Sequence, residues 1–166
     1  MRRLSVLIIV TLALLCCSCT NFLLLSPPER ITEFSSFAEI SFGDKSFSGK
    51  ISCLSPECIS FTFSEPEGIS GVSVRTDENG FFCDIHGAGS DIPYELLRND
   101  SCAVMLFEAV RCAVFSPADM TKNSNGDFTA DVLNGKYSAV FSADGKLKLI
   151  ASGNESPAFY AAFSYT

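Results

Sequence analysis

The residue types that most often act as bases, nucleophiles and metal ligands are sparse in this chain of 166 residues. The only histidine is His86, which follows an apolar segment. A nucleophile needs a base within hydrogen-bond reach, so a hydrolase would depend on His86 or on an unpaired carboxylate. Metal sites need several ligands at suitable spacing, and only Asp84 is expected to share a strand face with His86. We therefore predict no catalytic residues, no metal and no cofactor, and keep a hydrolase as a third hypothesis.

Two further patterns carry little chemistry. Four carboxylates at two predicted turns, Glu65, Glu67, Asp77 and Glu78, are of the type that binds calcium, but we interpret them as solvated. The segment 87–89, Gly-Ala-Gly, lacks the Lys-Ser/Thr pair of a phosphate-binding loop. We interpret it as a bend that ends a strand.

The amino terminus offers a covalent chemistry instead. Arg2 and Arg3 precede an apolar run from Leu4 to Leu15, which ends in a cluster of three cysteines and a serine, residues 16–19. A positive start, a short apolar centre and small residues at its end are typical of a signal peptide, which we predict at residues 1–18. A run of about a dozen residues is too short to span roughly 30 Å of hydrocarbon, so a permanent transmembrane anchor is the weaker alternative.

The cysteine cluster resembles the lipobox of bacterial lipoproteins, in which a cysteine is lipidated and becomes the new amino terminus. Cys19 fits best, with Ser18 before it, although Cys16 stands where the lipobox usually has Leu. Cys17 is the alternative acceptor, and apolar filler in the signal helix is the other interpretation of these cysteines. The resemblance implies a palmitate-type anchor at the extracytoplasmic face of the cell membrane. It leaves open which membrane of the envelope holds the protein.

The part of the chain that follows the signal is acidic. Two of the 12 basic residues lie in the signal, which leaves ten against 19 acidic residues. This charge excludes nucleic acid as a plausible partner and would repel anionic headgroups, so covalent lipid must hold the domain at the membrane. Residues 19–33 lack periodicity, contain Pro27 and Pro28, and are predicted to form a lipidated tether.

Five cysteines follow Cys19, and an odd number cannot all pair within one chain. They are Cys53, Cys58, Cys83, Cys102 and Cys112. Most lie in apolar segments, where a free cysteine packs as a small hydrophobic residue. Cys53 and Cys58 flank a plausible turn, so a disulfide between them is an open alternative.

Hydrophobic alternation with a period of two predicts antiparallel strands that bury one face. Asn-Gly pairs at residues 79–80 and 134–135 are strong hairpin signals. The alternating segments are 38–42, 47–53, 59–63, 72–76 and 81–85, and then 128–132, 137–141, 147–151 and 159–165.

The stretch 102–115 is continuously apolar rather than alternating, and residues 99–101, Asn-Asp-Ser, offer a helix cap before it. Its only charges, Glu108 and Arg111, share one face, so the helix must be mostly buried. We predict one α+β domain at 34–166: a curved antiparallel sheet of about nine strands, a half-barrel, with one apolar helix inserted after the fifth strand and packed on the concave face.

This arrangement, with the stretch from Ile59 to Val72, resembles the LolA/LolB-like lipoprotein-carrier superfamily. The resemblance implies an incomplete barrel whose concave side is covered by helices and, in the carriers, receives acyl chains. The carriers' helix-holding arginine is matched by type alone at Arg75, Arg98 and Arg111. No binding residue is therefore transferred.

The 15 phenylalanines matter because a concave interior that they do not fill becomes an apolar pocket. The first hypothesis is a non-catalytic binding module for a lipid or other apolar ligand. Its predicted lining is Phe61, Phe63, Met105, Phe141 and Phe163. The second is an envelope interaction or regulatory protein that contacts a protein partner without a small ligand, through exposed strand edges.

Overall fold

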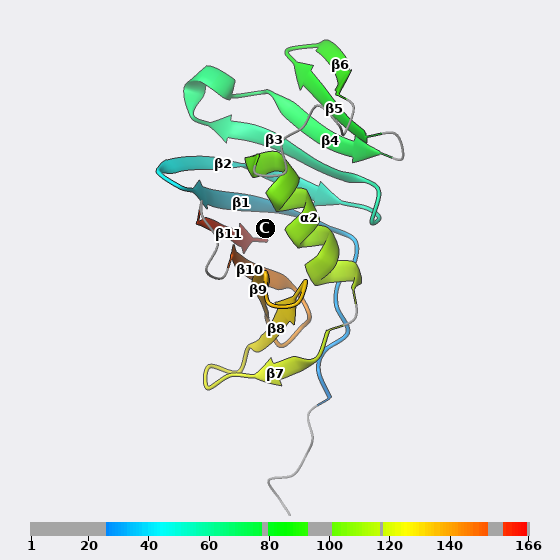
Figure 1. Cartoon of the computed structure of the whole chain (residues 1–166), viewed down its shortest axis with the longest axis vertical. Helices are drawn as coiled ribbons and strands as arrows, with labels where there is room; N and C mark the ends of the chain where they lie inside the picture. The colour runs from blue at the N-terminus through cyan, green and yellow to red at the C-terminus, as the bar shows by residue number, and fades with distance from the viewer. Residues whose placement is uncertain (1–25, 78–79, 93–100, 117, 153–157, 166) are drawn as a thin grey trace, which may run out of the picture.

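The structure is a computed structural model that describes residues 26–77, 80–92, 101–116, 118–152 and 158–165. Its core element is one antiparallel sheet of 11 strands (Figure 1). The strands are β1 (Phe34–Phe42), β2 (Lys45–Cys53), β3 (Ile59–Glu65), β4 (Ser73–Asp77), β5 (Gly80–Ile85), β6 (Ala88–Ile92), β7 (Met120–Lys122), β8 (Phe128–Val132), β9 (Tyr137–Phe141), β10 (Leu147–Ser152) and β11 (Phe159–Ser164). The helices are the short 3-10 helix η2 (Glu67–Ile69) and α2 (Cys102–Phe115).

The strand order is β6-β5-β4-β3-β2-β1-β11-β10-β9-β8-β7, so the first and last strands meet in the middle of the sheet. β6 and β7 form the two edges, and α2 lies between them in the chain. Figure 1 shows α2 lying across one face of the curved sheet, from the level of β3 to that of β8. The helix therefore covers the concave face, as the sequence predicts.

The α+β class, the open curved antiparallel sheet and the single α-helix of the described residues confirm the prediction, but the count of about nine strands is wrong. The structure adds β6 and β7, and α2 follows the sixth strand rather than the fifth. The segment 87–89 does not end the sheet: Gly87 turns with a φ of 90° and β6 begins at Ala88. Four of the five residues of β6 are exposed, so hydrophobic alternation had no signal there.

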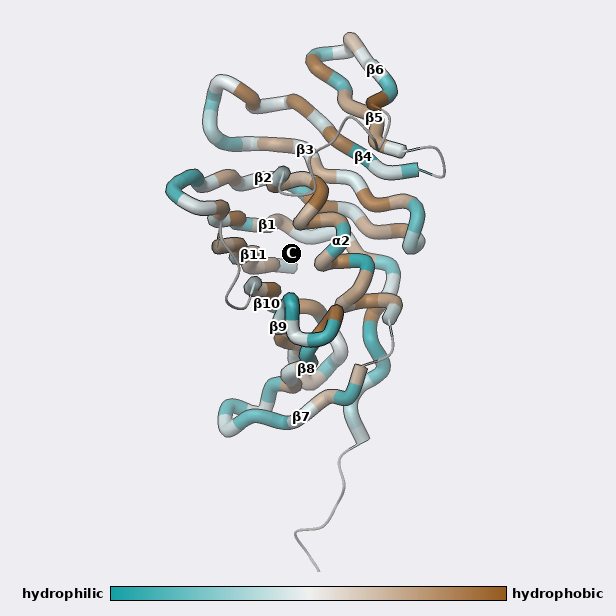
Figure 2. The backbone as a smooth tube through the Cα atoms, viewed as in Figure 1, coloured by the Kyte–Doolittle hydropathy of each residue, from teal (hydrophilic) through white to brown (hydrophobic). Residues whose placement is uncertain are grey.

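Alternation in the sequence becomes alternation in burial. β1 turns Phe34, Ser36, Ala38 and Ile40 to the core and exposes the residues between them. From the opposite side α2 buries Leu106, together with Met105, Phe107, Ala109, Val110, Ala113 and Val114. Figure 2 shows hydrophobic residues along α2 and along the strands, interrupted by hydrophilic ones. The core is the layer between α2 and the concave face of the sheet.

Both ends of α2 are capped. At the start, the Ser101 hydroxyl accepts a hydrogen bond from the Val104 amide at 3.3 Å, which satisfies one of the unpaired amides of the first turn. At the end, the Ser116 amide donates to the Cys112 carbonyl at 3.2 Å. Ser101 is thus the cap among the three predicted candidates, and the other two lie outside the described residues.

The last residues of the predicted tether contact the domain. The Ile31 amide donates to the Gly145 carbonyl at 3.2 Å. Gly145 has a φ of 82°, and a Cβ there would collide with the Glu29 carbonyl, so only glycine allows this close approach. The predicted signal peptide and Cys19 lie outside the described residues. Within the described part of the chain, no helix is long and apolar enough to cross a membrane.

The five later cysteines are all free in the structure. Cys53 is buried and Cys58 is exposed, so the alternative of a disulfide between them is not realised here. Burial raises the pKa of Cys53 to about 12 and that of Cys102 to about 11. Because the thiolate is the reactive form, these two thiols act as packing groups at neutral pH.

Candidate ligand-binding site

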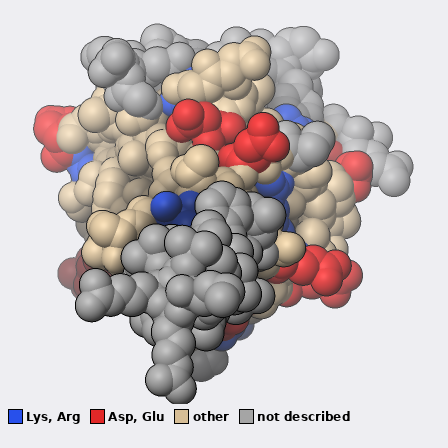
Figure 3. All heavy atoms as spheres, turned by 90° about the horizontal axis from the view of Figure 1, so that it is seen from below, with Lys and Arg blue, Asp and Glu red and all other residues tan. Residues whose placement is uncertain are grey.

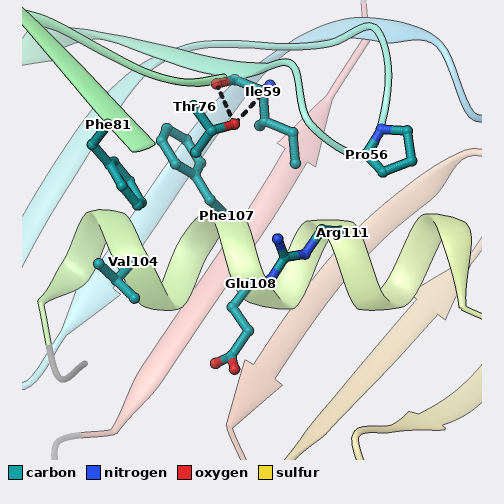
Figure 4. Close-up of a pocket in the computed structure, with 8 residues that line it drawn as sticks. All are labelled: Pro56, Ile59, Thr76, Phe81, Val104, Phe107, Glu108 and Arg111. Carbon is teal, nitrogen blue, oxygen red and sulfur yellow. Dashed lines mark hydrogen bonds between the residues drawn. The ribbon is translucent and has the colours of Figure 1, made fainter. Parts of the chain in front are cut away.

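A pocket opens between α2 and the strands β3 to β5, with a volume of about 170 Å³ (Figure 4). Four lining residues, Val104, Phe107, Glu108 and Arg111, come from α2 at helical spacings of three and four, which place them on one side of the helix. The other lining residues are Pro56, Ile59, Thr76 and Phe81. The pocket therefore lies where α2 faces β3, β4 and β5.

Two aromatic rings form its apolar wall. Phe81 of β5 and Phe107 of α2 stack with 5.5 Å between ring centroids and 17° between ring planes. Both side chains are almost fully buried. This pair joins the helix to the outer strands, and offers a flat apolar surface at the base of the pocket.

Thr76 places a hydroxyl in the same wall, but its hydrogen bonds are already made. Its Oγ1 accepts from the Ile59 amide at 3.1 Å and donates to the Glu57 carbonyl at 2.9 Å. Figure 4 shows this hydroxyl turned toward Ile59. A buried hydroxyl that is satisfied in this way does not require a polar ligand group, so an apolar group can occupy the space beside it.

The carboxylate of Glu108 binds two side chains that do not line the pocket. Its Oε2 accepts from Lys136 Nζ at 2.9 Å and from the Tyr137 hydroxyl at 3.0 Å. Figure 4 shows the carboxylate pointing away from Phe107. Burial, and then the charge of Glu108, raise the pKa of Tyr137 to about 12. Glu108 and Arg111 both line the pocket, as two charges on one face of the helix would, but the carboxylate of Glu108 is held by Lys136 and Tyr137.

Arg111 is exposed at the rim of the pocket. Among the described lining residues, Glu108 is paired with Lys136, and Arg111 supplies a second, positive charge. An arginine presents several donors in a planar fork that suits carboxylate and phosphate oxygens. The arrangement can hold an apolar group against the Phe81–Phe107 pair and an anionic group at the rim.

The five residues predicted to contact a ligand are placed in the core. Phe61, Met105, Phe141 and Phe163 are buried and Phe63 is half-buried. Phe61 and Phe63 meet edge to face with 4.8 Å between centroids. None of the five lines the pocket beneath α2, and their contact with a ligand stays a prediction.

Sequence reasoning missed Phe81 and Phe107. The sequence places Phe81 in a predicted strand and Phe107 in the predicted helix, without assigning either residue to a site. The helical spacing of Val104, Phe107 and Arg111 marks one face of α2 and was the available signal. The angle at which the helix crosses the sheet decides which strands this face meets. The spacing of residues within the helix does not determine that angle.

His86 lies in an exposed turn with a φ of 54°. The Asp84 carboxylate accepts a hydrogen bond from the Gly87 amide at 2.8 Å, so it stabilises the turn. Among the described residues, no group of three His, Cys, Asp or Glu side chains could hold a metal ion.

Solved structures that resemble this chain share little sequence identity with it. No protein-family model and no curated protein sequence matches the chain. An uncharacterized conserved protein from Thermus thermophilus is 10% identical with a TM-score of 0.46, over 81% of this chain and 79% of that one. A LolA superfamily protein from Nitrosomonas europaea is 7% identical with a TM-score of 0.41, over 83% and 86%.

A putative outer membrane lipoprotein-sorting protein domain from Vibrio parahaemolyticus is 8% identical with a TM-score of 0.37, over 84% of this chain and 86% of that one. Likeness at this level carries no argument about family or activity.

Proposed function

We propose that this chain is an extracytoplasmic lipoprotein, anchored through Cys19, whose domain binds an apolar ligand in the pocket beneath α2. The observation that carries the binding part is the stacked pair Phe81–Phe107 beside an exposed Arg111. This combination suits an amphiphile with an acyl chain and an anionic head, such as a fatty acid or the acyl end of a lipid.

The size of the pocket limits how much of such a ligand it holds. About 170 Å³ is smaller than the roughly 300–1,000 Å³ of pockets that take drug-sized ligands. It suits one short acyl segment or the end of a longer chain. Each methylene buried there contributes about 0.8 kcal/mol, so a few methylenes give binding that is weak and reversible, as a carrier or sensor requires.

The anchoring part of the proposal has a separate basis. It rests on the basic start, the apolar run and the cysteine cluster of residues 1–19. Two or more acyl chains on one cysteine hold a protein at a membrane far more firmly than a single chain does. Such an anchor places the domain on the extracytoplasmic face of the cell membrane, where lipids are at hand.

Photolabelling in membranes tests the binding part. Membranes that contain the full chain are irradiated with a diazirine fatty acid, and the labelled peptides are mapped by mass spectrometry. We expect labelling of the peptides that carry Phe81 and Phe107, and loss of most of it in Val104→Trp, which fills the pocket. Leu133→Trp, at an exposed position away from the pocket, is the matched control and should label normally. Labelling that Val104→Trp leaves unchanged would contradict the proposal.

A further inference from the structure

The sheet face opposite α2 carries a second hollow, at the centre of the sheet. Outward residues of β1 and β11 meet there, in the register Ser41↔Tyr160 and Glu39↔Ala162. The hollow has a volume of about 390 Å³. Its lining is Phe37, Glu39, Ile40, Ser41, Ser46, Phe47, Ser48, Glu65 and Tyr160. No residue is shared with the pocket beneath α2.

Two aromatic side chains are exposed on this face. Phe37 has 38% of its surface exposed and Tyr160 has 43%. Phe37 precedes Glu39 by two residues on β1, and Tyr160 is the diagonal neighbour of Glu39 across the β1–β11 pair. Side chains at such positions lie within reach of one another on one face of a sheet. The two rings therefore flank the carboxylate of Glu39.

A neighbouring hollow extends this surface past β3. It is lined by Ser46, Ser64, Glu65, Pro66, Glu67 and Ser70. The two hollows share Ser46 and Glu65 and so form one continuous groove, which we call the outer groove. The Ser48 hydroxyl donates to Glu65 Oε2 at 3.2 Å and holds that carboxylate in the groove.

The outer groove is lined by three glutamates and several hydroxyls, and none of its lining residues is Lys or Arg. Lys50, opposite Phe37 in the β1–β2 register, is a basic neighbour on this face, outside the lining. Figure 3 shows a different pattern on the molecule seen from below, where Lys and Arg side chains lie between separate acidic groups. The groove thus combines unmixed negative charge with exposed aromatic rings.

We propose that the outer groove docks a basic segment of a protein partner. One Lys or Arg side chain lies over Tyr160 or Phe37, because aromatic faces attract cations, and its charge is balanced by Glu39 or Glu65. Charge complementarity is the argument for this occupant, and the excess of acidic residues in the whole chain strengthens it.

The dimensions of the groove suit a short peptide. From β11 to β3 it crosses three strand spacings, about 14 Å at roughly 4.8 Å each. An extended peptide covers that span with about four residues. Because the groove lies on the opposite side of the sheet from α2, this interaction is separate from the proposed ligand pocket, and both sites can be occupied together.

Peptide binding to the full chain in nanodiscs of phosphatidylcholine tests the proposal, because this lipid carries no net charge. Fluorescence anisotropy follows a labelled hexa-arginine peptide, with a hexa-glutamate peptide and empty nanodiscs as references. We expect saturable binding of hexa-arginine that Tyr160→Ala weakens about fivefold or more, and that the pair Glu39→Gln with Glu65→Gln weakens by at least as much.

The control removes the same charge elsewhere. Glu33→Gln with Glu57→Gln changes two exposed carboxylates that lie just before β1 and β3, away from the outer groove. This pair should alter binding less than twofold. An equal loss in this control would show diffuse charge attraction and overturn the proposal. Unchanged binding in Tyr160→Ala, or no saturable binding at all, would also overturn it. Val104→Trp should bind the peptide normally, which separates this test from that of the ligand pocket.

Discussion

The guanidinium of Arg30 lies over the ring of Phe141, with 5.6 Å between Cζ and the ring centroid. Its Nη2 donates to the Ala118 carbonyl at 2.8 Å, and its Nη1 donates to the Ser116 carbonyl. Burial lowers the pKa of this arginine from its usual value. Arg30 therefore joins the residues before β1 to the end of α2 and to the buried face of β9. The predicted tether is thus hydrogen-bonded to the chain at the end of the helix that covers the sheet.

Removal of these Arg30 contacts should destabilise the domain. We expect Arg30→Ala to lower the free energy of unfolding by about 1.5–3 kcal/mol, the range for hydrogen bonds to charged groups. Urea unfolding followed by circular dichroism measures it. Arg75→Ala is the control, because Arg75 is exposed and its main contact is with the ring of Phe82 at 4.3 Å. Its loss should be about 1 kcal/mol or less. Equal losses for the two variants would mean that the Arg30 contacts do not hold the helix.

Leu106 tests the contact between α2 and the sheet. It is 1% exposed, and Leu106→Asp places an unpaired carboxylate in the core. We expect a loss of about 3 kcal/mol or more, comparable to large core truncations, seen as loss of cooperative thermal unfolding or as rapid proteolysis. Arg111→Ala is the matched control on the exposed side of α2 and should change the melting temperature little. A normal melting curve for Leu106→Asp would mean that α2 is detached from the sheet.

The raised pKa of Tyr137 predicts a loss of stability at high pH. Its folded pKa of about 12 exceeds the unfolded value of about 10, so the folded state keeps a proton that the unfolded state has lost. The stabilisation is complete below pH 10 and is lost as the pH rises through about 12. Tyrosinate absorbance at 295 nm, with Tyr137→Phe as the difference, measures this titration.

Glu108→Gln separates the two causes of that shift. The pKa of Tyr137 should fall but stay above its usual value, because burial is the larger cause. Tyr165 is the internal reference: its hydroxyl donates to the Leu147 carbonyl at 3.0 Å, and its pKa of about 12 should not change. A shift of Tyr165 that matches that of Tyr137 would point to a general loosening of the fold.

Radiolabelled palmitate tests the anchor. In a bacterial host we expect label in the full chain, label in Cys16→Ser and Cys17→Ser, and none in Cys19→Ser. Loss of label in Cys17→Ser alone would assign the anchor to Cys17 instead. Label in none of the four proteins would remove the lipoprotein proposal, and would leave the pocket and the outer groove to be judged by their own experiments.

The sequence by itself determined most of the strands and the helix. Alternation in β1 and β2 predicts one buried face, and the structure buries Ala38, Ile40 and Ile51 there. The continuous apolar run of 102–115 predicts a buried helix with a cap among residues 99–101; the structure confirms the helix and shows that Ser101 caps it. These features depend on neighbours along the chain, so local pattern is sufficient to reveal them.

Only the tertiary structure decided which residues share a site. The edge strands β6 and β7 make their contacts through the backbone, so their side chains carry little pattern. Phe81 and Phe107 come from separate elements, and they stack because α2 crosses the sheet at that level. The five residues predicted to line a cavity lie in the core or pack against it, and their contact with a ligand stays a prediction. Alternation in the sequence tells on which face of a strand a residue lies. Strand order, sheet curvature and the crossing of the helix decide which residue stands opposite it. These three features depend on contacts between segments far apart in the chain, so local pattern does not reveal them.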